Sequence, residues 1–293
     1  MTAFLLLLIF IVTPTYNVCA TGKDMVLIKA GEYTKKVFFQ KEASPKRVYI
    51  SEYSIDTFPV SIGEYSSCVQ NGKCKKEPLE RIYKESMKNN ETTFGYDNYF
   101  SAERNEYPMT WVNLDEAQTY CLAQGKRLPT EAEWEKAARG DKEPEPHWAV
   151  NETPWGWDPS SPPGKSREYC SQVRKARDTS LDPSPFGVYN MQGKIQEWTL
   201  DYFLWIFERD FPTSNPLCTK AIFDAHPVET KAYYKDMKEK PTDPRTVKGG
   251  CSSAARITII SGGGVNYSGK KGYRDVGFRC VKSALNAPED FNK

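Results

Sequence analysis

The chain has 293 residues, of which 39% are hydrophobic and 13% aromatic, so it can form a packed domain and does not have the composition of a disordered chain. Its 40 basic and 38 acidic residues give a formal net charge of +2. This near balance gives no electrostatic case for a nucleic acid or an anionic membrane surface as a partner.

The N-terminus has the pattern of a secretion signal. An apolar run, Phe4–Val12, is followed by Val18-Cys19-Ala20, which predicts a signal peptide over residues 1–20 with cleavage after Ala20. The run is too short for a membrane-spanning helix, which needs about 20 residues. Cleavage before Cys19 with lipid attachment is the alternative, but Asn17 and Val18 fit it poorly. We therefore expect an exported protein, periplasmic or secreted, without a transmembrane segment, and a lipid anchor is the less favoured interpretation.

The cysteines indicate disulfide bonds. Without Cys19, seven remain: Cys68, Cys74, Cys121, Cys170, Cys218, Cys251 and Cys280. Export makes disulfides the default, and an odd count leaves at least one thiol free or paired outside the chain. Cys68 and Cys74 flank a short loop with Asn71-Gly72 at its bend, which predicts a structural disulfide. Metal binding is disfavoured there because no second cysteine pair or histidine cluster lies nearby.

The first half of the chain predicts short strands and three helices. Met25–Ile28 is a short apolar run, Arg47–Ile50 and Tyr53–Asp56 alternate as strands do, and a helix runs from about Val60 towards Cys68. Residues 83–106 are polar and predict a surface insertion. A buried segment follows at 109–112, and then Asn113 caps a helix that ends at Gly125.

The third predicted helix begins with a complete start signal. Thr130 and Glu133 form an S/T-x-x-E capping box, because each side chain can bond to the backbone N–H of the other residue. Gly140 predicts the end of this helix.

The second half of the chain has less periodicity. Residues 141–182 are rich in proline, glycine and charge. Alternation at Ile195, Glu197 and Thr199 predicts a strand after a tight turn at Gly193. Residues 202–246 form a long aromatic and charged excursion, and loops of this length are usually functional or mobile. Two closing segments at 248–251 and 275–280 precede a polar tail, residues 284–293.

The string Gly125–Glu135 (Gly-Lys-Arg-Leu-Pro-Thr-Glu-Ala-Glu-Trp-Glu) resembles the formylglycine-generating enzyme family, also called the sulfatase-modifying-factor domain. Four blocks match this family in its own order: Met25–Tyr33, Asn113–Gly140, Gly187–Trp198 and Lys248–Cys280. A weaker fifth match runs from Ile55 to Tyr65. The resemblance implies one domain over residues 25–283, with a mixed α/β fold that is low in regular secondary structure and distantly similar to C-type lectins.

The resemblance also implies a disulfide between Cys121 and Cys280. A second bridge of the family is absent here, because its first position is Ala138.

The pairing of the remaining thiols stays open, since Cys251 stands where the family has a serine. We favour a disulfide of Cys251 with Cys170 or Cys218. It can also be a buried, inert thiol or, as the least favoured interpretation, a reactive cysteine at a catalytic site near Lys248 and Arg256.

Calcium is the metal that the resemblance favours. Asn190, Gly193, Ile195 and Glu197 fall on family calcium positions and would offer an amide oxygen, two backbone carbonyls and a carboxylate, which suits this ion. The alternative is a glutamate that caps a tight turn without any ion. The family's other calcium site has no matching asparagine near 170–172 and is not expected.

Copper is not expected. Family enzymes bind copper(I) through two cysteines in the block R-G-G-S-W-x-C-x-x-x-x-C, because this soft ion selects sulfur ligands. Here the block opens as Lys248-Gly249-Gly250, and the two thiol positions are Ala254 and Ile259. Cys251 is the only cysteine between Cys218 and Cys280, and neither histidine of the chain lies in an iron-binding motif.

These features predict an exported, formylglycine-generating-enzyme-like protein without oxidase activity that acts as a binding or accessory (maturation) protein. Its partner would be a protein or peptide, contacted through the aromatic excursion at Trp205, Phe207, Tyr233 and Tyr234, although these aromatics can also simply cover the core. The alternative is an oxidoreductase of the secreted compartment that generates formylglycine or oxidises another peptide substrate.

Overall fold

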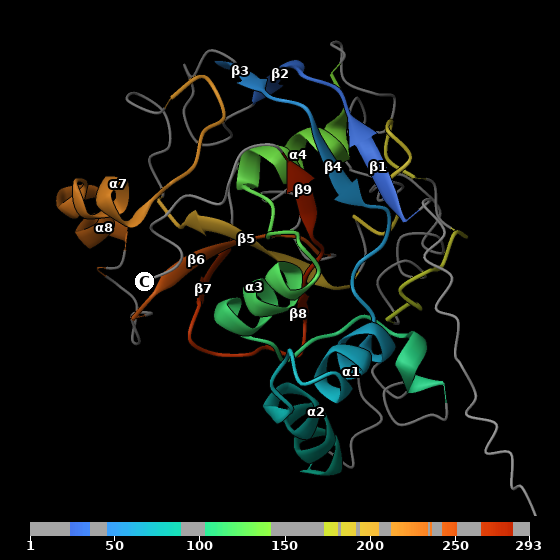
Figure 1. Cartoon of the computed structure of the whole chain (residues 1–293). Coiled ribbons are helices and arrows are strands. Elements are labelled where there is room, and N and C mark those ends of the chain that lie inside the picture. The colour runs from blue at the N-terminus through green and yellow to red at the C-terminus, as the bar shows by residue number, and fades with distance from the viewer. Residues whose placement is uncertain are drawn as a thin grey trace, which may run out of the picture.

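The computed structural model describes residues 24–35, 46–88, 103–141, 173–180, 183–191, 194–204, 212–233, 235, 242–250 and 265–283. In this part of the chain four short strands are followed by a run of helices, and further short strands and helices follow, with much of the backbone outside regular secondary structure (Figure 1). This agrees with the predicted mixed α/β fold.

The strands form three small sheets. The first has the order β1-β4-β9, the second is the hairpin β2-β3, and the third has the order β7-β6-β5-β8. Their bounds are β1 Met25–Ile28, β2 Gly31–Lys35, β3 Lys46–Ile50, β4 Tyr53–Asp56, β5 Gln196–Tyr202, β6 Pro244–Gly249, β7 Val265–Ser268, β8 Val276–Gly277 and β9 Val281–Ser283. All described pairs are antiparallel except β5 with β8.

The helices are α1 Ile62–Gln70, α2 Glu77–Lys88, α3 Leu114–Ala123, α4 Glu131–Arg139, α7 Lys220–Asp224 and α8 Pro227–Tyr233, with a short 3-10 helix at Arg104–Glu106. Side chains cap the starts of α1, α3, α4 and α7. The predicted caps of α3 and α4 are confirmed. Asn113 and Thr130 each accept the N–H of the third helical residue, and the glutamate there reaches back. Ser61 forms the same box before α1.

Strand β5 is the centre of the fold. It lies between β6 and β8, and α3 and α4 contact it, so all seven of its residues are buried. The predicted strand is confirmed, but the alternation at its residues does not separate a core face from a solvent face. Trp198 of β5 packs in one apolar cluster with Phe278 and Tyr120, and Trp134 of α4 packs in a second cluster beneath β1 and β4.

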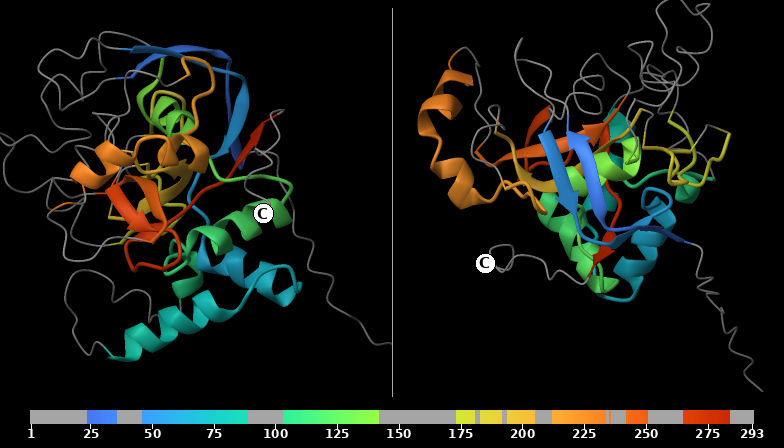
Figure 2. Two further views of the ribbon diagram at one scale, coloured as in Figure 1. Left: turned by 90° about the vertical axis from the view of Figure 1, so that its left-hand side faces the viewer. Right: turned by 90° about the horizontal axis from the view of Figure 1, so that it is seen from above.

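Two segments differ from the sequence prediction. Residue 83 lies inside helix α2, which buries Ile82 and runs to Lys88, so the predicted insertion begins with a helix. The aromatic excursion contains α7 and α8, which lie to one side of the central sheet in Figure 1 and in the right-hand view of Figure 2. Helices α7 and α8 have only five and seven residues, which is too short for a clear apolar periodicity. No helix among the described residues has the length and apolar character to cross a membrane.

Candidate functional site

Lys248 of β6 lies in a buried cluster of charges at the point where the catalytic block of the resembled family would begin. Its Nζ is 3.3 Å from Oε1 of Glu131 and 3.5 Å from Oε2 of Glu135, both on α4. Lys35 of β2 approaches the same carboxylates at 3.4 and 3.9 Å, and Arg139 bonds Glu135 at 2.8 Å. Buried charges persist only when they are paired in this way, so the cluster fixes the end of β6 to α4.

Electrostatics keep members of this cluster ionised. Burial opposes the charge of Glu135, but Lys248, Lys35 and Arg139 outweigh burial and lower the pKa of this carboxyl. Burial also lowers the pKa of Lys35, but Glu131 and Glu135 more than offset it, so the pKa of Lys35 is raised. Because both groups remain charged at neutral pH, they act as an ion-pair network and not as proton donors or acceptors.

Two glycines lie at the end of β6, and any other residue at either position would be strained. Gly249 and Gly250 have φ angles of +82° and +93°, in the left-handed region that favours glycine. A Cβ on Gly249 would lie 2.9 Å from the carbonyl oxygen of Met191, and one on Gly250 would lie 2.7 Å from Cγ of Gln196. The direction in which the following segment starts is therefore fixed.

The segment that follows, residues 251–264, lies outside the described residues. It contains Cys251, Ala254 and Ile259, so their roles rest on the sequence alone. Within the described part, Gln196 is the side chain that borders the start of this segment. It is buried, and its Oε1 has no hydrogen-bond partner.

The predicted calcium ligands are only partly described. Glu197 accepts hydrogen bonds from Nε of Arg279 at 2.7 Å, from Nη2 of Arg279 at 2.8 Å and from Nε1 of Trp134 at 2.7 Å. Three of about four lone-pair positions of the carboxylate are thus used, so a cation would share Glu197 with Arg279. Asn190 has a φ of 55° and donates from its amide to two backbone carbonyls.

Gly193 lies outside the described residues, while Ile195 directly precedes β5. Amide, carboxylate and carbonyl oxygens suit calcium in kind, and calcium binding stays a prediction. Among the described residues, no group of three or more histidine, cysteine, aspartate and glutamate side chains is arranged to hold a metal ion.

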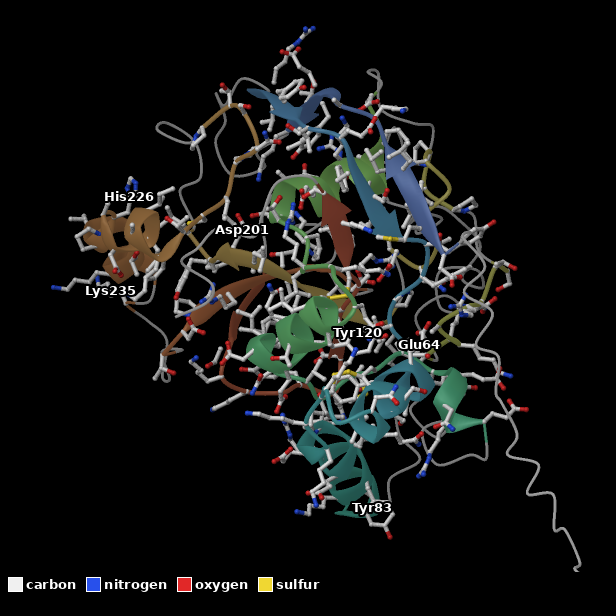
Figure 3. All side chains as sticks on the ribbon, viewed as in Figure 1. Glu64, Tyr83, Tyr120, Asp201, His226 and Lys235 are labelled. Carbon is white, nitrogen blue, oxygen red and sulfur yellow. A yellow bond between two sulfur atoms is a disulfide. The ribbon has the colours of Figure 1, made fainter. Side chains whose placement is uncertain are left out.

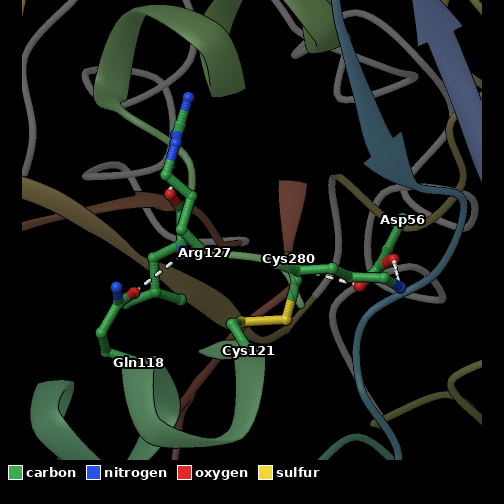
Figure 4. The surroundings of a disulfide bond; sticks show 7 residues. Asp56, Gln118, Cys121, Arg127 and Cys280 are labelled. Carbon is green, nitrogen blue, oxygen red and sulfur yellow. Dashed lines mark hydrogen bonds and ion pairs between the residues drawn. A yellow bond between two sulfur atoms is a disulfide. The ribbon is translucent and has the colours of Figure 1, made fainter. Parts of the chain in front are cut away.

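Both predicted disulfides are present. Cys68 pairs with Cys74, and Cys121 of α3 pairs with Cys280, which directly precedes β9 (Figure 4). The second bridge is held in a polar frame: Asp56 accepts the N–H of Cys280 at 2.9 Å and a bond from Lys126 at 2.6 Å. This bridge ties the C-terminal strand to the helix layer.

Cys218 corrects one interpretation of the cysteines. It is a free, fully buried thiol, so Cys218 is not the partner of Cys251. It lies in a small third apolar cluster with Tyr202 and Leu204. Burial, and next to it the charge of Asp201, raises the pKa of this thiol. Cys170 and Cys251 lie outside the described residues, and their pairing remains open.

Asp201 of β5 is a site residue that the sequence analysis did not identify. Its side chain is labelled in Figure 3. Its Oδ2 accepts the N–H of Glu131 at 2.6 Å, and its Oδ1 accepts the N–H of Cys218 at 2.8 Å. Burial, together with the charge of Glu131, raises the pKa of Asp201 to about 7. The local sequence does not indicate that Asp201 is buried, because the groups that surround it come from residues far away in the chain.

The predicted aromatic contact surface is mostly outside the described residues. This holds for Trp205, Phe207 and Tyr234, and for the side chain of Tyr233 at the end of α8. Nearby, Tyr202 is buried and its ring is covered by Arg245, whose Cζ is 3.5 Å from the ring centroid. The ring of Tyr202 therefore covers the core, while the contact role of the four predicted aromatics stays a prediction.

Comparison with known proteins gives the family. Residues 13–284 match the family described as the sulfatase-modifying factor enzyme 1-like domain. The chain therefore belongs to this family.

Among similar proteins is the uncharacterized protein YfmG of Bacillus subtilis (strain 168), 30% identical over 213 residues, which are 60% of this chain and 41% of YfmG. Inactive C-alpha-formylglycine-generating enzyme 2 of Bos taurus is 24% identical over 55% of this chain and 64% of its own length. The formylglycine-generating enzyme of Streptomyces coelicolor is 33% identical over 39% of this chain and 38% of its own length. The chain thus spans 38% to 64% of the length of these relatives.

Two solved structures share the fold. Treponema denticola variable protein 1 superposes with a TM-score of 0.52 at 17% identity, over 88% of this chain and 94% of that one. PvdO from Pseudomonas aeruginosa superposes with a TM-score of 0.54 at 19% identity, over 88% of this chain and 93% of that one. At such identities the likeness concerns architecture and not activity.

Proposed function

We propose that this chain is an exported member of the family that does not carry out copper-dependent oxidation and that acts as a binding or accessory protein. The observation that carries the proposal is the replacement of both copper-binding cysteines by Ala254 and Ile259. Copper(I) requires soft sulfur ligands, and Cys251 alone cannot supply two.

The free thiol among the described residues does not substitute for the lost pair. A nucleophilic or metal-binding cysteine must reach the thiolate state and be accessible. Cys218 is 0% exposed, and burial and Asp201 both raise the pKa of its thiol, so it remains a neutral, packed side chain. This environment supports a structural role for Cys218.

The scaffold around Lys248-Gly249-Gly250, where the copper-binding block of the family would begin, is nevertheless intact. The Gly249-Gly250 exit, the Lys248 anchor on α4 and the Cys121–Cys280 bridge keep the end of β6 in a defined place. A maintained scaffold without its metal ligands is the pattern expected for a protein that binds and does not oxidise. Relatives named as inactive formylglycine-generating enzymes add support.

Export is part of the proposal. The apolar run at Phe4–Val12 and the small residues before position 21 support it, and so do the two disulfides, which persist in oxidising compartments. Mass analysis of the mature protein tests export directly. An N-terminus at Thr21 is the expected result, and an N-terminus at Met1 would contradict it.

A peptide oxidation assay tests the lack of oxidase activity. The purified protein is loaded with copper(I) and incubated with a cysteine-containing sulfatase peptide and oxygen, with the Streptomyces coelicolor enzyme in parallel as the positive control. We expect no aldehyde in the peptide mass and no oxygen uptake above the blank. Stoichiometric aldehyde formation would refute the proposal.

A further inference from the structure

The loop between α1 and α2 carries an asparagine followed directly by a glycine. Asn71-Gly72 is the only Asn-Gly pair in the chain, and both residues are exposed. The loop and its two helices lie at one end of the molecule (Figure 1). In such a pair the backbone nitrogen of the glycine can attack the side-chain carbonyl of the asparagine and close a small ring. Nothing shields this nitrogen from the side, since a Cβ on Gly72 would have no atom within 4 Å.

The backbone conformation of the pair opposes this reaction. Asn71 caps the end of α1 with φ −80° and ψ 5°, and Gly72 follows with φ +69°. The N–H of Gly72 donates to the carbonyl of Val69 at 2.9 Å, and the N–H of Lys73 donates to the carbonyl of Cys68 at 3.1 Å. These two bonds form a Schellman motif, a common end of a helix at a glycine. The N–H that must lose its proton for the attack is therefore hydrogen-bonded.

The Cys68–Cys74 disulfide closes the same turn. The two cysteines are 6 positions apart, and the N–H of Cys74 donates to the carbonyl of Cys68 at 3.3 Å. Ring closure brings the nitrogen of Gly72 to the side chain of Asn71, which requires ψ of Asn71 to leave its near-helical value of 5°. That rotation swings the chain after Gly72 away from α1. The bridge opposes this movement because it bonds Cys74 to Cys68.

We propose that Asn71 is a site of spontaneous deamidation that the Cys68–Cys74 bridge keeps closed: the bridged protein retains the asparagine, and a chain whose bridge has not formed converts it. The nitrogen of Gly72 bonds to Cγ of Asn71, the amide C–N bond of the side chain breaks, and ammonia leaves. Water then opens the cyclic imide at one of its two carbonyls, which gives aspartate or isoaspartate. Water is the only co-reactant.

The conversion changes the end of α1. An aspartate at position 71 places a negative charge beside the last carbonyls of the helix, where the helix dipole disfavours it. An isoaspartate adds one carbon to the backbone before Gly72, which disturbs the Schellman motif. The new charge lies in a loop with three exposed lysines, Lys73, Lys75 and Lys76. A chain that stays in a reducing compartment is thus marked irreversibly, whereas a chain oxidised after export is not.

Peptide mapping of aged protein tests the proposal. The full-length wild type, the variant Cys68→Ala/Cys74→Ala and the reduced wild type unfolded in urea are incubated at one mildly alkaline pH. The peptide carrying Asn71 is quantified by mass spectrometry, with fragmentation that separates aspartate from isoaspartate. The three backbone hydrogen bonds of the turn should slow the double variant about tenfold relative to the unfolded chain. The bridge should slow the wild type further, by up to about thirtyfold.

Two controls separate the bridge from other causes. Asn71→Gln removes the reactive pair, so the mass increase of this peptide should disappear. If tryptophan fluorescence shows the double variant to be unfolded, folded wild type is aged in graded reductant that leaves the buried Cys121–Cys280 bridge closed. Conversion should then follow the reduced fraction of Cys68–Cys74. The proposal is overturned if the bridged wild type reacts as fast as the unfolded chain, if loss of the bridge leaves the rate unchanged, or if the mass increase persists in Asn71→Gln.

Discussion

The long-range disulfide Cys121–Cys280 should be the largest single contribution to stability that a simple substitution can remove. It joins α3 to the segment before β9, whereas Cys68–Cys74 closes a local loop. The double variants Cys121→Ala/Cys280→Ala and Cys68→Ala/Cys74→Ala form a matched pair. Both delete one bridge and differ mainly in the length of chain that the bridge closes.

The expected magnitudes follow from chain entropy. A disulfide stabilises by restricting the unfolded chain, and the effect grows with the logarithm of loop length. The cysteines are 159 positions apart in one bridge and 6 apart in the other. The model then gives a loss of about 5 kcal/mol for Cys121–Cys280 and about 2 kcal/mol for Cys68–Cys74. A domain is typically stable by about 5–15 kcal/mol, so the first loss is severe.

The assay is equilibrium unfolding in urea under non-reducing conditions, with tryptophan fluorescence as the signal. Wild type and both double variants are compared at one temperature and pH, and the free energies of unfolding are obtained by linear extrapolation. The long-range variant should lose about 3 kcal/mol more than the local one. Equal losses, or a larger loss on removing Cys68–Cys74, would refute the reasoning.

Three further predictions concern the site. Gly250→Ala should lower the melting temperature more than Gly72→Ala. Both positions have a positive φ, but only at Gly250 does the added Cβ come within 2.7 Å of another atom, Cγ of Gln196. Equal melting temperatures of the two variants would argue against this contact. Glu135→Gln removes one of the two buried carboxylates that neutralise Lys35 and Lys248 and should cost about 3–5 kcal/mol at neutral pH. Because the pKa of Glu135 is lowered, its stabilisation is present above pH 4 to 5 and is lost on acidification. The difference in free energy of unfolding between wild type and Glu135→Gln, measured in urea, should therefore decrease as the pH is lowered. An increase would contradict the account. Calcium should raise the melting temperature of the wild type relative to EDTA but not that of Asn190→Gly, and the same increment in both would remove Asn190 from the ligand set.

Local signals in the sequence were sufficient for the elements that begin with strong caps. The helices after Asn113 and Thr130 were predicted because the capping residue and its glutamate are three positions apart. Helices α7 and α8 were missed because they are short and mostly exposed, and so leave little apolar periodicity. The alternation in β5 predicted the strand but not its burial on both faces, which depends on α3 and α4.

In the site, too, some features could be predicted from the sequence, whereas others depend on contacts between distant residues. The partners Cys121 and Cys280 could be predicted because the resemblance fixes their positions, and Cys68 and Cys74 because a short turn separates them. The pairings of Lys248 with α4 and of Arg279 with Glu197 could not, because each joins residues at least 82 positions apart. Asp201 is the clearest case, since its buried state depends on α4 and on Cys218, which the chain brings together only after folding.

The claim on which this account depends is that the scaffold of the family is kept while its copper chemistry is lost. The most direct measurement is mass analysis of a sulfatase peptide after incubation with the pure, copper-loaded, exported protein. The account predicts that the peptide cysteine is recovered unchanged while the Streptomyces coelicolor enzyme converts it under the same conditions. Recovery of the formylglycine aldehyde with this protein alone would contradict it.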